Sequence, residues 1–255
     1  MISIFKKRIK RIPITKFDNI DKMPEAVFFD YDGTICDNSK YLVKAFNYAL
    51  KTNFNKKKDK NLLTAIKKIK KDSEKWAYIK QNCPIELFEK CNQDYDFYIS
   101  SQKLRLIPYA LKTIKLFNKY NIPLFIISQK YGDGLRNELK KAGILQYFKN
   151  AYGTLDFGEL QKPTKEYMEA VKKKTGTKNK HCWMIGDRNS DVVAALNMNS
   201  NAFIINKEEV EIIRNNYNDL IGKQIFFTSY KRLCTFIKKQ FKFITKRNNT
   251  NKKNI

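Results

Sequence analysis

The sequence is poor in the residues that build zinc sites and disulfide frameworks. It holds one histidine, His181, and five cysteines among 255 residues. The cysteines are odd in number, widely scattered and never arranged as Cys-x-x-Cys; they are Cys36, Cys83, Cys91, Cys182 and Cys234. This spacing indicates neither a zinc site nor a disulfide framework, and it is typical of a chain kept reduced in the cytoplasm. We expect a cytoplasmic protein in which the single histidine has a structural role.

Long apolar runs are also absent. No segment approaches the roughly 18 consecutive apolar residues that mark a membrane-spanning helix, which argues against a transmembrane segment. Hydrophobic residues nonetheless make up 42% of the chain, enough to bury a sizeable core. A length of 255 residues allows one large domain, or a core domain that carries an insert.

Acidic residues are scarce relative to basic ones. The chain has 51 Lys and Arg against 25 Asp and Glu, a formal net charge of +26. Such an excess fits a polyanionic partner, either nucleic acid or an anionic membrane surface, or a general drift in composition. Residues 38–106 and residues 229–255 each carry a net charge of +9, so the charge is spread rather than gathered in one patch. The spread favours drift for most of the chain.

The two ends of the chain are strongly basic. Residues 1–24 interleave isoleucines with lysines and arginines, which fits a membrane-surface or transit segment, or an arm that packs a few apolar residues on the domain. We favour the arm. Residues 238–255 hold seven basic residues and no acid. We expect a mobile tail there, able to make weak contacts with nucleic acid or anionic membranes.

The chain is organised around the segment from Val27 to Ser39. Its first three residues are apolar without alternation, which predicts a strand buried on both faces, as in a parallel sheet covered by helices. Asp30 and Asp32 follow. Two carboxylates directly after a buried strand repel each other, and a bound divalent cation would explain why both are present. Gly33 permits a sharp turn, and the Thr34 hydroxyl is suited to bond freed backbone or a ligand oxygen.

In later segments, polar residues again follow apolar runs. Ser128 and Asp187 each follow an apolar run that predicts a buried strand, and Asp191 lies four residues after Asp187. Lys162 precedes a proline at an expected helix start, where its charge would offset crowded carboxylates. Each of these signals is weak alone, and together they predict polar groups meeting at one edge of a sheet.

Four motifs in this order resemble those of the haloacid dehalogenase superfamily. They are Asp-x-Asp-x-Thr from Asp30, the strand-ending Ser128, Lys162 before a proline, and Gly-Asp-x-x-x-Asp from Gly186. The resemblance implies an α/β fold, with a doubly wound, Rossmann-like parallel sheet as its core. Asn199 stands where the superfamily commonly has glycine, and asparagine also tolerates the left-handed backbone.

Residues 38–106 show only helical periodicity. Apolar residues recur at helix spacing there, and no strand-like alternation interrupts them. An insert of this length at this point resembles the helical type 1 cap of the superfamily, which closes over the site, excludes water and selects the leaving group. We therefore divide the chain into a core of residues 25–37 and 107–237 and a cap of residues 38–106, with a closing helix that ends near Ile237.

The resemblance also implies a role for each motif residue. Asp30 would be the nucleophile that attacks phosphorus, and Asp32 would be the general acid and base. The phosphoryl oxygens would be held by Thr34, Ser128 and Lys162. The ligands of Mg²⁺ would be Asp30, the backbone carbonyl of Asp32, and Asp187, with Asp191 in the same cluster, either on the metal side or against Lys162.

These roles predict a magnesium-dependent phosphatase that acts through an aspartyl-phosphate. The family subclass that the sequence resembles includes phosphoglycolate phosphatases, and a small phosphorylated metabolite is the expected substrate. Alternatives are a phosphatase for nucleotides or nucleic-acid ends, a phosphomutase of the same superfamily, and a catalytically idle binding protein. The presence of every catalytic residue type argues against the last.

Overall fold

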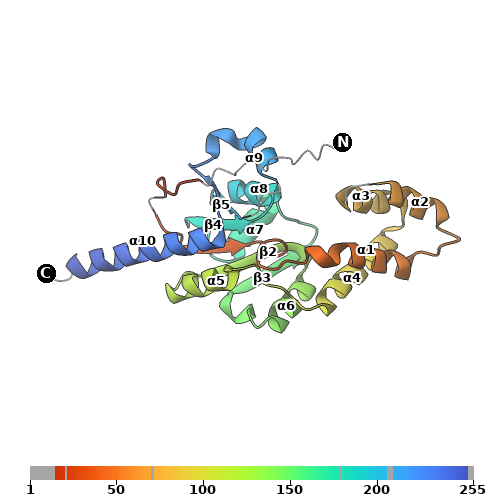
Figure 1. Ribbon diagram of the computed structural model, residues 1–255, viewed down its shortest axis with the longest axis horizontal. Coiled ribbons are helices and arrows are strands. Elements are labelled where there is room, and N and C mark those ends of the chain that lie inside the picture. Colours follow the sequence, from red (N-terminus) through yellow and green to blue (C-terminus); the bar gives the residue numbers. More distant parts are fainter. Residues whose placement is uncertain (1–14, 21, 70–71, 179, 206–208, 252–255) are drawn as a thin grey trace, which may run out of the picture.

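The architecture is a single parallel sheet covered by helices (Figure 1). It comes from a computed structural model that describes residues 15–20, 22–69, 72–178, 180–205 and 209–251. Within these residues, six strands form the sheet in the order β3-β2-β1-β4-β5-β6, and all neighbours are parallel. The strands are β1 (Ala26–Phe29), β2 (Leu124–Tyr131), β3 (Asn150–Thr154), β4 (Cys182–Gly186), β5 (Asn201–Ile204) and β6 (Ile225–Phe227). The predicted doubly wound α/β fold is confirmed.

The strands are apolar without alternation because both faces of the sheet are covered. Phe28 points into a cluster with the helices α7 (Lys165–Lys174), α8 (Asn189–Asn197) and α9 (Val210–Tyr217). Phe29, its neighbour in the chain, points into the opposite cluster with α5 (Ala110–Lys119), α6 (Gly132–Lys141) and α10 (Tyr230–Asn251). Figure 1 shows α8 and α9 on one side of the sheet and α5 and α6 on the other. The result is a three-layer core.

Four helices stand between β1 and β2 in the chain and form what we call the helical insert. They are α1 (Ser39–Asn53), α2 (Lys60–Lys68), α3 (Asp72–Asn82) and α4 (Ile85–Ser101). The insert has an apolar cluster of its own, in which the Trp76 ring meets the rings of Phe46 and Tyr95 edge-on. Figure 1 shows it beside the sheet rather than against either face.

The described N-terminal segment of the chain packs on the core. Phe17 lies against the rings of Phe203, Phe226 and Phe236, as expected of an arm that packs apolar side chains. The rest of the proposed N-terminal arm, residues 1–14, lies outside the described residues. None of the helices in the described part of the chain combines the length and apolar character required to cross a bilayer.

Two predicted boundaries were wrong. The closing helix α10 does not end near Ile237 but continues through Asn251, so most of the segment expected to be a mobile tail is helical. One reason is a contact that sequence periodicity does not reveal, because the Phe241 ring stacks on Tyr120 of the core with centroids 3.7 Å apart. Strand β2 continues past Ile127 to Tyr131, with a shift in its register against β3.

Candidate active site

The candidate site lies where the strand order reverses. From β1 the chain proceeds outward to β2 and β3, then returns to β4 on the other side of β1. Such a reversal leaves a crevice at the carboxyl ends of the two central strands. Asp30 directly follows β1, and Asp187 directly follows β4. The backbone N–H of Asp30 donates to the carbonyl oxygen of Ile185 at 2.9 Å, which ties the two strand ends together.

Two glycines allow the carboxylates to crowd into this crevice. Gly33 has a φ of +77° in the turn after β1, and a Cβ there would overlap the carboxylate of Asp187. Gly186 ends β4, and a Cβ there would overlap the side chain of Asp191. A side chain at either position would push an acidic group out of the cluster, so both motifs need glycine for close approach, and Gly33 is also needed for its left-handed turn.

Three carboxylates and one lysine form the centre of the site. Oxygen atoms of Asp30, Asp187 and Asp191 lie within 4.8 Å of one another. Lys162 Nζ is 2.7 Å from Asp30 Oδ1 and 2.5 Å from Asp191 Oδ1, and it donates to the carbonyl oxygen of Ile127 at 3.3 Å. All four side chains are largely removed from water. The structure thus brings together four residues that lie between positions 30 and 191 of the chain.

The electrostatics of the cluster are unbalanced in favour of negative charge. Burial raises the pKa of Asp30 to about 7; Lys162 opposes this rise, and Asp191 and Asp187 add to it. Burial and the charge of Asp191 raise the pKa of Asp187 to about 6. Burial alone would lower the pKa of Lys162, but the Asp191 and Asp30 carboxylates raise it above its ordinary value, so this lysine stays charged. Two cations, Lys162 and Arg188, face three carboxylates, which leaves the cluster short of positive charge.

This shortage is what a hard divalent cation would correct. Carboxylate oxygens are the ligands that Mg²⁺ prefers, and Mg²⁺ is commonly held by few carboxylates together with substrate oxygens. Asp30 and Asp187 supply such oxygens directly after β1 and β4, whereas Asp191 also holds part of the backbone. Its Oδ2 accepts from the backbone N–H groups of Asp187 and Arg188 at 2.9 and 3.0 Å, which holds the turn that leads into α8. The residues present fit a magnesium ion.

Thr34 and Asp32 have different surroundings although both belong to the first motif. The Thr34 hydroxyl is buried and donates to Asp187 Oδ1 at 3.2 Å, so it lies beneath the cavity and orients a carboxylate. Its predicted contact with phosphate stays a prediction. Asp32 lines the cavity, and its Oδ1 accepts from Asn38 Nδ2 at 2.6 Å. Asn38 accepts in turn from the Cys36 thiol at 3.1 Å, which orients its amide.

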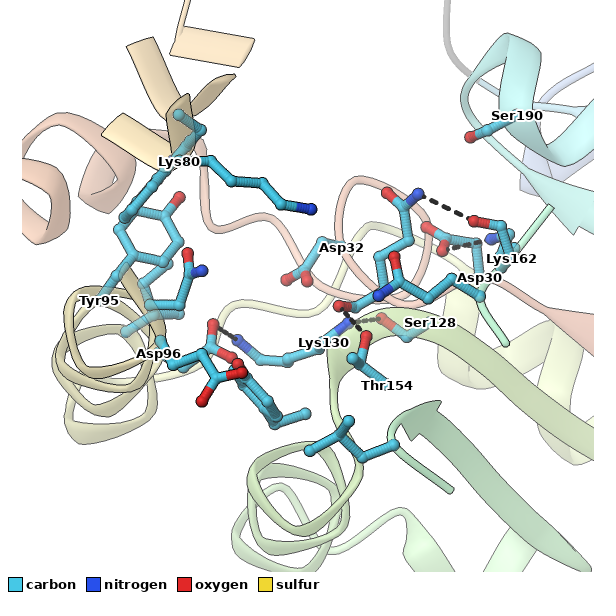
Figure 2. Close-up of a pocket in the computed structure, with 18 of the residues that line it drawn as sticks. Asp30, Asp32, Lys80, Tyr95, Asp96, Ser128, Lys130, Thr154, Lys162 and Ser190 are labelled. Atoms are coloured by element: carbon cyan, nitrogen blue, oxygen red, sulfur yellow. Dashed lines mark hydrogen bonds and ion pairs between the residues drawn. The ribbon is translucent and has the colours of Figure 1, made fainter. Parts of the chain in front are cut away.

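The site opens into a cavity of about 730 Å³ between the core and the helical insert. Figure 2 shows Asp30, Asp32, Ser128 and Lys162 on the core side of this cavity and Lys80, Tyr95 and Asp96 on the insert side. Ser128 Oγ accepts from the backbone N–H of Lys130 at 3.2 Å, so its hydroxyl hydrogen is available to a ligand. The insert contributes an apolar wall made of Leu42, Trp76, Ile85, Phe88 and Ile99.

Lys130 is a site residue that sequence reasoning missed. Its side chain is 3% exposed and joins three elements, with Nζ 3.2 Å from Asp96 Oδ1 on α4 and 3.1 Å from Glu138 Oε1 on α6. It lines the cavity, as does Arg188, whose Nε is 3.8 Å from Asp187 Oδ2. The sequence signal that could have found Lys130 and Arg188 is their position, since each lies within two residues of a motif residue. Neither partner of Lys130 is near it in the sequence.

Comparison with known proteins agrees with this geometry. The profile of the family described as haloacid dehalogenase-like hydrolase matches residues 27–205. The chain belongs to this family. The match runs from the first strand to the fifth and includes every motif residue named above, so the family membership predicted from the motifs is confirmed. Among curated proteins, none matches the sequence.

Solved structures share the fold across nearly their whole length. A predicted phosphoglycolate phosphatase from Haemophilus somnus is 17% identical, with a TM-score of 0.62 over 85% of this chain and 99% of that one. A predicted phosphatase from Clostridium acetobutylicum is 18% identical, with a TM-score of 0.61 over 86% and 100%. A hydrolase of the superfamily from Ehrlichia chaffeensis is 20% identical, with a TM-score of 0.54 over 86% and 98%. At such low sequence identities, the similarity establishes a shared fold only.

Proposed function

We propose that the protein is a magnesium-dependent phosphatase that hydrolyses the phosphate monoester of a small metabolite. The observation that carries the proposal is the arrangement at the switch point. Asp30, a carboxylate that follows β1, meets a buried lysine and two further carboxylates beside the cavity between the core and the insert. Phosphoryl transfer needs in-line positioning and neutralisation of charge more than it needs elaborate covalent chemistry, and this arrangement supplies both.

The reaction divides into two displacements at phosphorus. In the first, a carboxylate oxygen of Asp30 bonds to phosphorus while the ester oxygen leaves, and Asp32 gives that oxygen a proton. The product is an alcohol and an aspartyl-phosphate. In the second, Asp32 takes a proton from water as the water oxygen attacks phosphorus, which frees inorganic phosphate and restores the Asp30 carboxylate. Asp32 suits this exchange because it lines the cavity and is held by Asn38.

The remaining polar residues hold the phosphoryl group and the metal. Ser128 and Lys162 line the cavity and are placed to donate to phosphoryl oxygens. Mg²⁺ would be held by Asp30, the backbone carbonyl of Asp32, and Asp187; when bound it screens the repulsion between the attacking carboxylate and the phosphate. Asp191 keeps Lys162 and the α8 turn in place through the contacts described above.

We propose that the helical insert serves as the cap of this enzyme. It provides the apolar wall of the cavity, and a wall of that kind excludes water from the reacting groups, which strengthens electrostatic interactions and protects the phosphoenzyme intermediate from uncontrolled side reactions. The same wall contacts whatever part of the substrate leaves as the alcohol, so it selects the leaving group.

The test is hydrolysis of p-nitrophenyl phosphate by the purified chain. We expect turnover with Mg²⁺ present and none in excess chelator, restored when Mg²⁺ is returned. The Asp30→Asn variant, prepared in the same way, controls for a contaminating phosphatase. Equal turnover in chelator would exclude the metal role, and turnover retained by the variant would show that the activity does not come from Asp30.

A further inference from the structure

Leu155 presents an apolar side chain to the cavity from the core. It directly follows β3, lines the cavity and is 63% exposed. Thr154, the residue before it, lies on the core side of the cavity (Figure 2). Within the described part of the chain, the other core residues that line the cavity carry polar or charged groups, so Leu155 is the one aliphatic side chain on this wall. The reaction proposed above gives it no role.

The backbone at Leu155 is one that leucine rarely adopts. Its φ is +72°, in the left-handed region, where a Cβ crowds the following carbonyl oxygen. Four residues other than glycine have a positive φ in the described part of the chain, and two of them are Asn121 and Asn199. Asparagine is the residue type that tolerates this backbone best after glycine. A leucine in its place next to a cavity indicates that the side chain, rather than the local backbone, decides the residue type.

The residues that follow Leu155 are anchored in the core, so its turn is fixed. Asp156 Oδ2 lies 2.8 Å from Arg136 Nη1 on α6. The Phe157 ring meets the ring of Tyr167 on α7 edge-on, with centroids 5.4 Å apart. Strand β3 holds the chain on the other side. Leu155 is thus the residue that this anchored connection leaves directed to the cavity.

The position of Leu155 along the sheet places it beyond the residues that would hold the phosphoryl group. Thr154 pairs with Tyr131, which is three residues past Ser128 on β2. Leu155 therefore lies farther out from the sheet than Ser128, on the side where the alcohol part of a bound ester would extend. A leucine exposed on an open surface is ordinary, but this one borders the path of the leaving group.

The insert leaves apolar surface open to the same cavity. Ile85, the first residue of α4, is 50% exposed and lines the cavity, and so does Phe88 one turn later. Leu155 and Ile85 come from the two walls, and the protein buries neither of them. Apolar surface of this kind is removed from water most favourably when a third apolar group enters between the walls.

We propose that Leu155 is a specificity-determining residue that packs against an apolar part of the leaving alcohol, so that the preferred substrate is the phosphate monoester of an alcohol with an alkyl or aryl portion. The inference rests on the proposed phosphatase function and narrows its substrate class. Ser128 and Lys162 hold the phosphoryl end, Leu155 borders the alcohol from the core, and the apolar wall of the insert borders it from the other side. Selectivity then comes from the apolar area that the ester buries.

The experiment compares matched esters on the full-length chain with Mg²⁺. One series is straight-chain alkyl phosphates of two to eight carbons, and the second has the same chains ending in a hydroxyl group. Each is assayed with the native protein, with Leu155→Asn, which suits the left-handed backbone but removes the apolar contact, and with Leu155→Met, which keeps an apolar side chain. Leu160→Asn is the matched control, because Leu160 is an exposed leucine between β3 and α7 that does not line the cavity.

We expect kcat/KM of the native protein to rise about twofold per carbon over the first carbons of the alkyl series, the order for a partly buried methylene, and to be lower for the hydroxyl-ended ester of each length. Leu155→Asn should lose about tenfold on hexyl phosphate and at most about twofold on ethyl phosphate. Leu155→Met should keep the preference, and Leu160→Asn should behave like the native protein. The unfolding temperature of Leu155→Asn should not fall below that of the native protein, because asparagine adopts the left-handed backbone more readily.

An equal loss by Leu155→Asn on ethyl and hexyl phosphate would assign Leu155 a contact with the insert rather than with the substrate. That result, an absence of any loss, the same loss in Leu160→Asn, or a native protein indifferent to chain length would overturn the inference while leaving the phosphatase intact. Failure of the native protein to hydrolyse any ester, p-nitrophenyl phosphate included, would instead overturn the proposed function and the inference with it.

Discussion

Asp30 and Asp32 stand two residues apart, but the structure gives them different surroundings. Asp30 is half-buried against Lys162 and shares its cluster with two other carboxylates, whereas Asp32 lines the cavity and is held by Asn38. The first environment suits a group that must approach a phosphate under neutralising charge. The second suits a group that exchanges protons with the leaving oxygen and with water. The difference leads to a prediction for each residue.

We expect Asp30→Asn to lower kcat by about 10⁴-fold, because the amide keeps the shape but is a poor nucleophile, and removing a nucleophile costs losses of this order. Asp32→Asn should lower kcat by about 10² to 10⁴-fold, the usual contribution of a general acid and base, with the smaller loss for esters of acidic alcohols. Acid quenching of Asp32→Asn during turnover, followed by peptide mass spectrometry, should find phosphate on Asp30. Phosphate on Asp32 in the Asp30→Asn variant would reverse the two roles.

At the scale of elements, Lys130 is one of the residues that join α4 to the core. Its amine lies between Asp96 of the insert and Glu138 of α6, and burial would lower its pKa, but the charges of Asp32, Asp96 and Glu138 raise it. Lys130 is therefore a fixed charge at the junction. Because Asp96 is the residue of the insert that contacts Lys130, a substitution of Asp96 tests this junction.

We expect Asp96→Asn to raise KM about fivefold with little change in thermal stability, since a neutral amide weakens one charge-assisted contact by about 1 kcal/mol. Hydrogen exchange in α4 should become faster. The control is Asp94→Asn on the same helix, because Asp94 accepts from Asn53 within the insert at 2.7 Å. Should the two variants change KM equally, the effect would belong to the insert's own stability and the junction would have no special role.

For the molecule as a whole, the crowded carboxylates link stability to pH and metal. The folded protein raises the pKa of Asp30 to about 7 and that of Asp187 to about 6, mainly through burial, from an ordinary value of 3.8. Between pH 4 and pH 7 the unfolded chain therefore ionises these groups while the folded protein retains protons, so their contribution to the free energy of unfolding falls as pH rises. A bound divalent cation reverses this, because it binds the ionised form.

We therefore expect Mg²⁺ to raise the unfolding temperature more at pH 8 than at pH 5, where protons compete with the metal for the same oxygens. Calorimetry or dye-monitored melting with and without Mg²⁺ measures the difference, and taking the difference removes the effect of other titrating groups. Asp187→Asn should reduce the Mg²⁺ effect at pH 8. An equal Mg²⁺ effect at the two pH values would contradict a metal site built on these two carboxylates.

Local patterns in the sequence were sufficient for the strands of the core and for the meeting of Asp30 with Asp187 at one edge of the sheet. A strand buried on both faces must be apolar throughout, so β1 and β4 can be recognised in the sequence. Polar residues directly after such strands meet at one edge of the sheet in any doubly wound fold. Asp30 and Asp187 could be placed together on that basis. The left-handed backbone at Asn199, with a φ of +51°, likewise follows from its residue type after a helix.

Contacts between distant segments were decided only by the tertiary structure. Thr34 turns to Asp187 rather than lining the cavity, Lys130 joins Asp96 to Glu138, and α10 continues past Ile237 with its Phe241 stacked on Tyr120. The position of Leu155 in the cavity is of the same kind. Periodicity tells which face of a helix is apolar but not which neighbour that face meets, because the neighbour is set by the packing of whole elements. The residues that sequence reasoning missed are those whose partners come from another element.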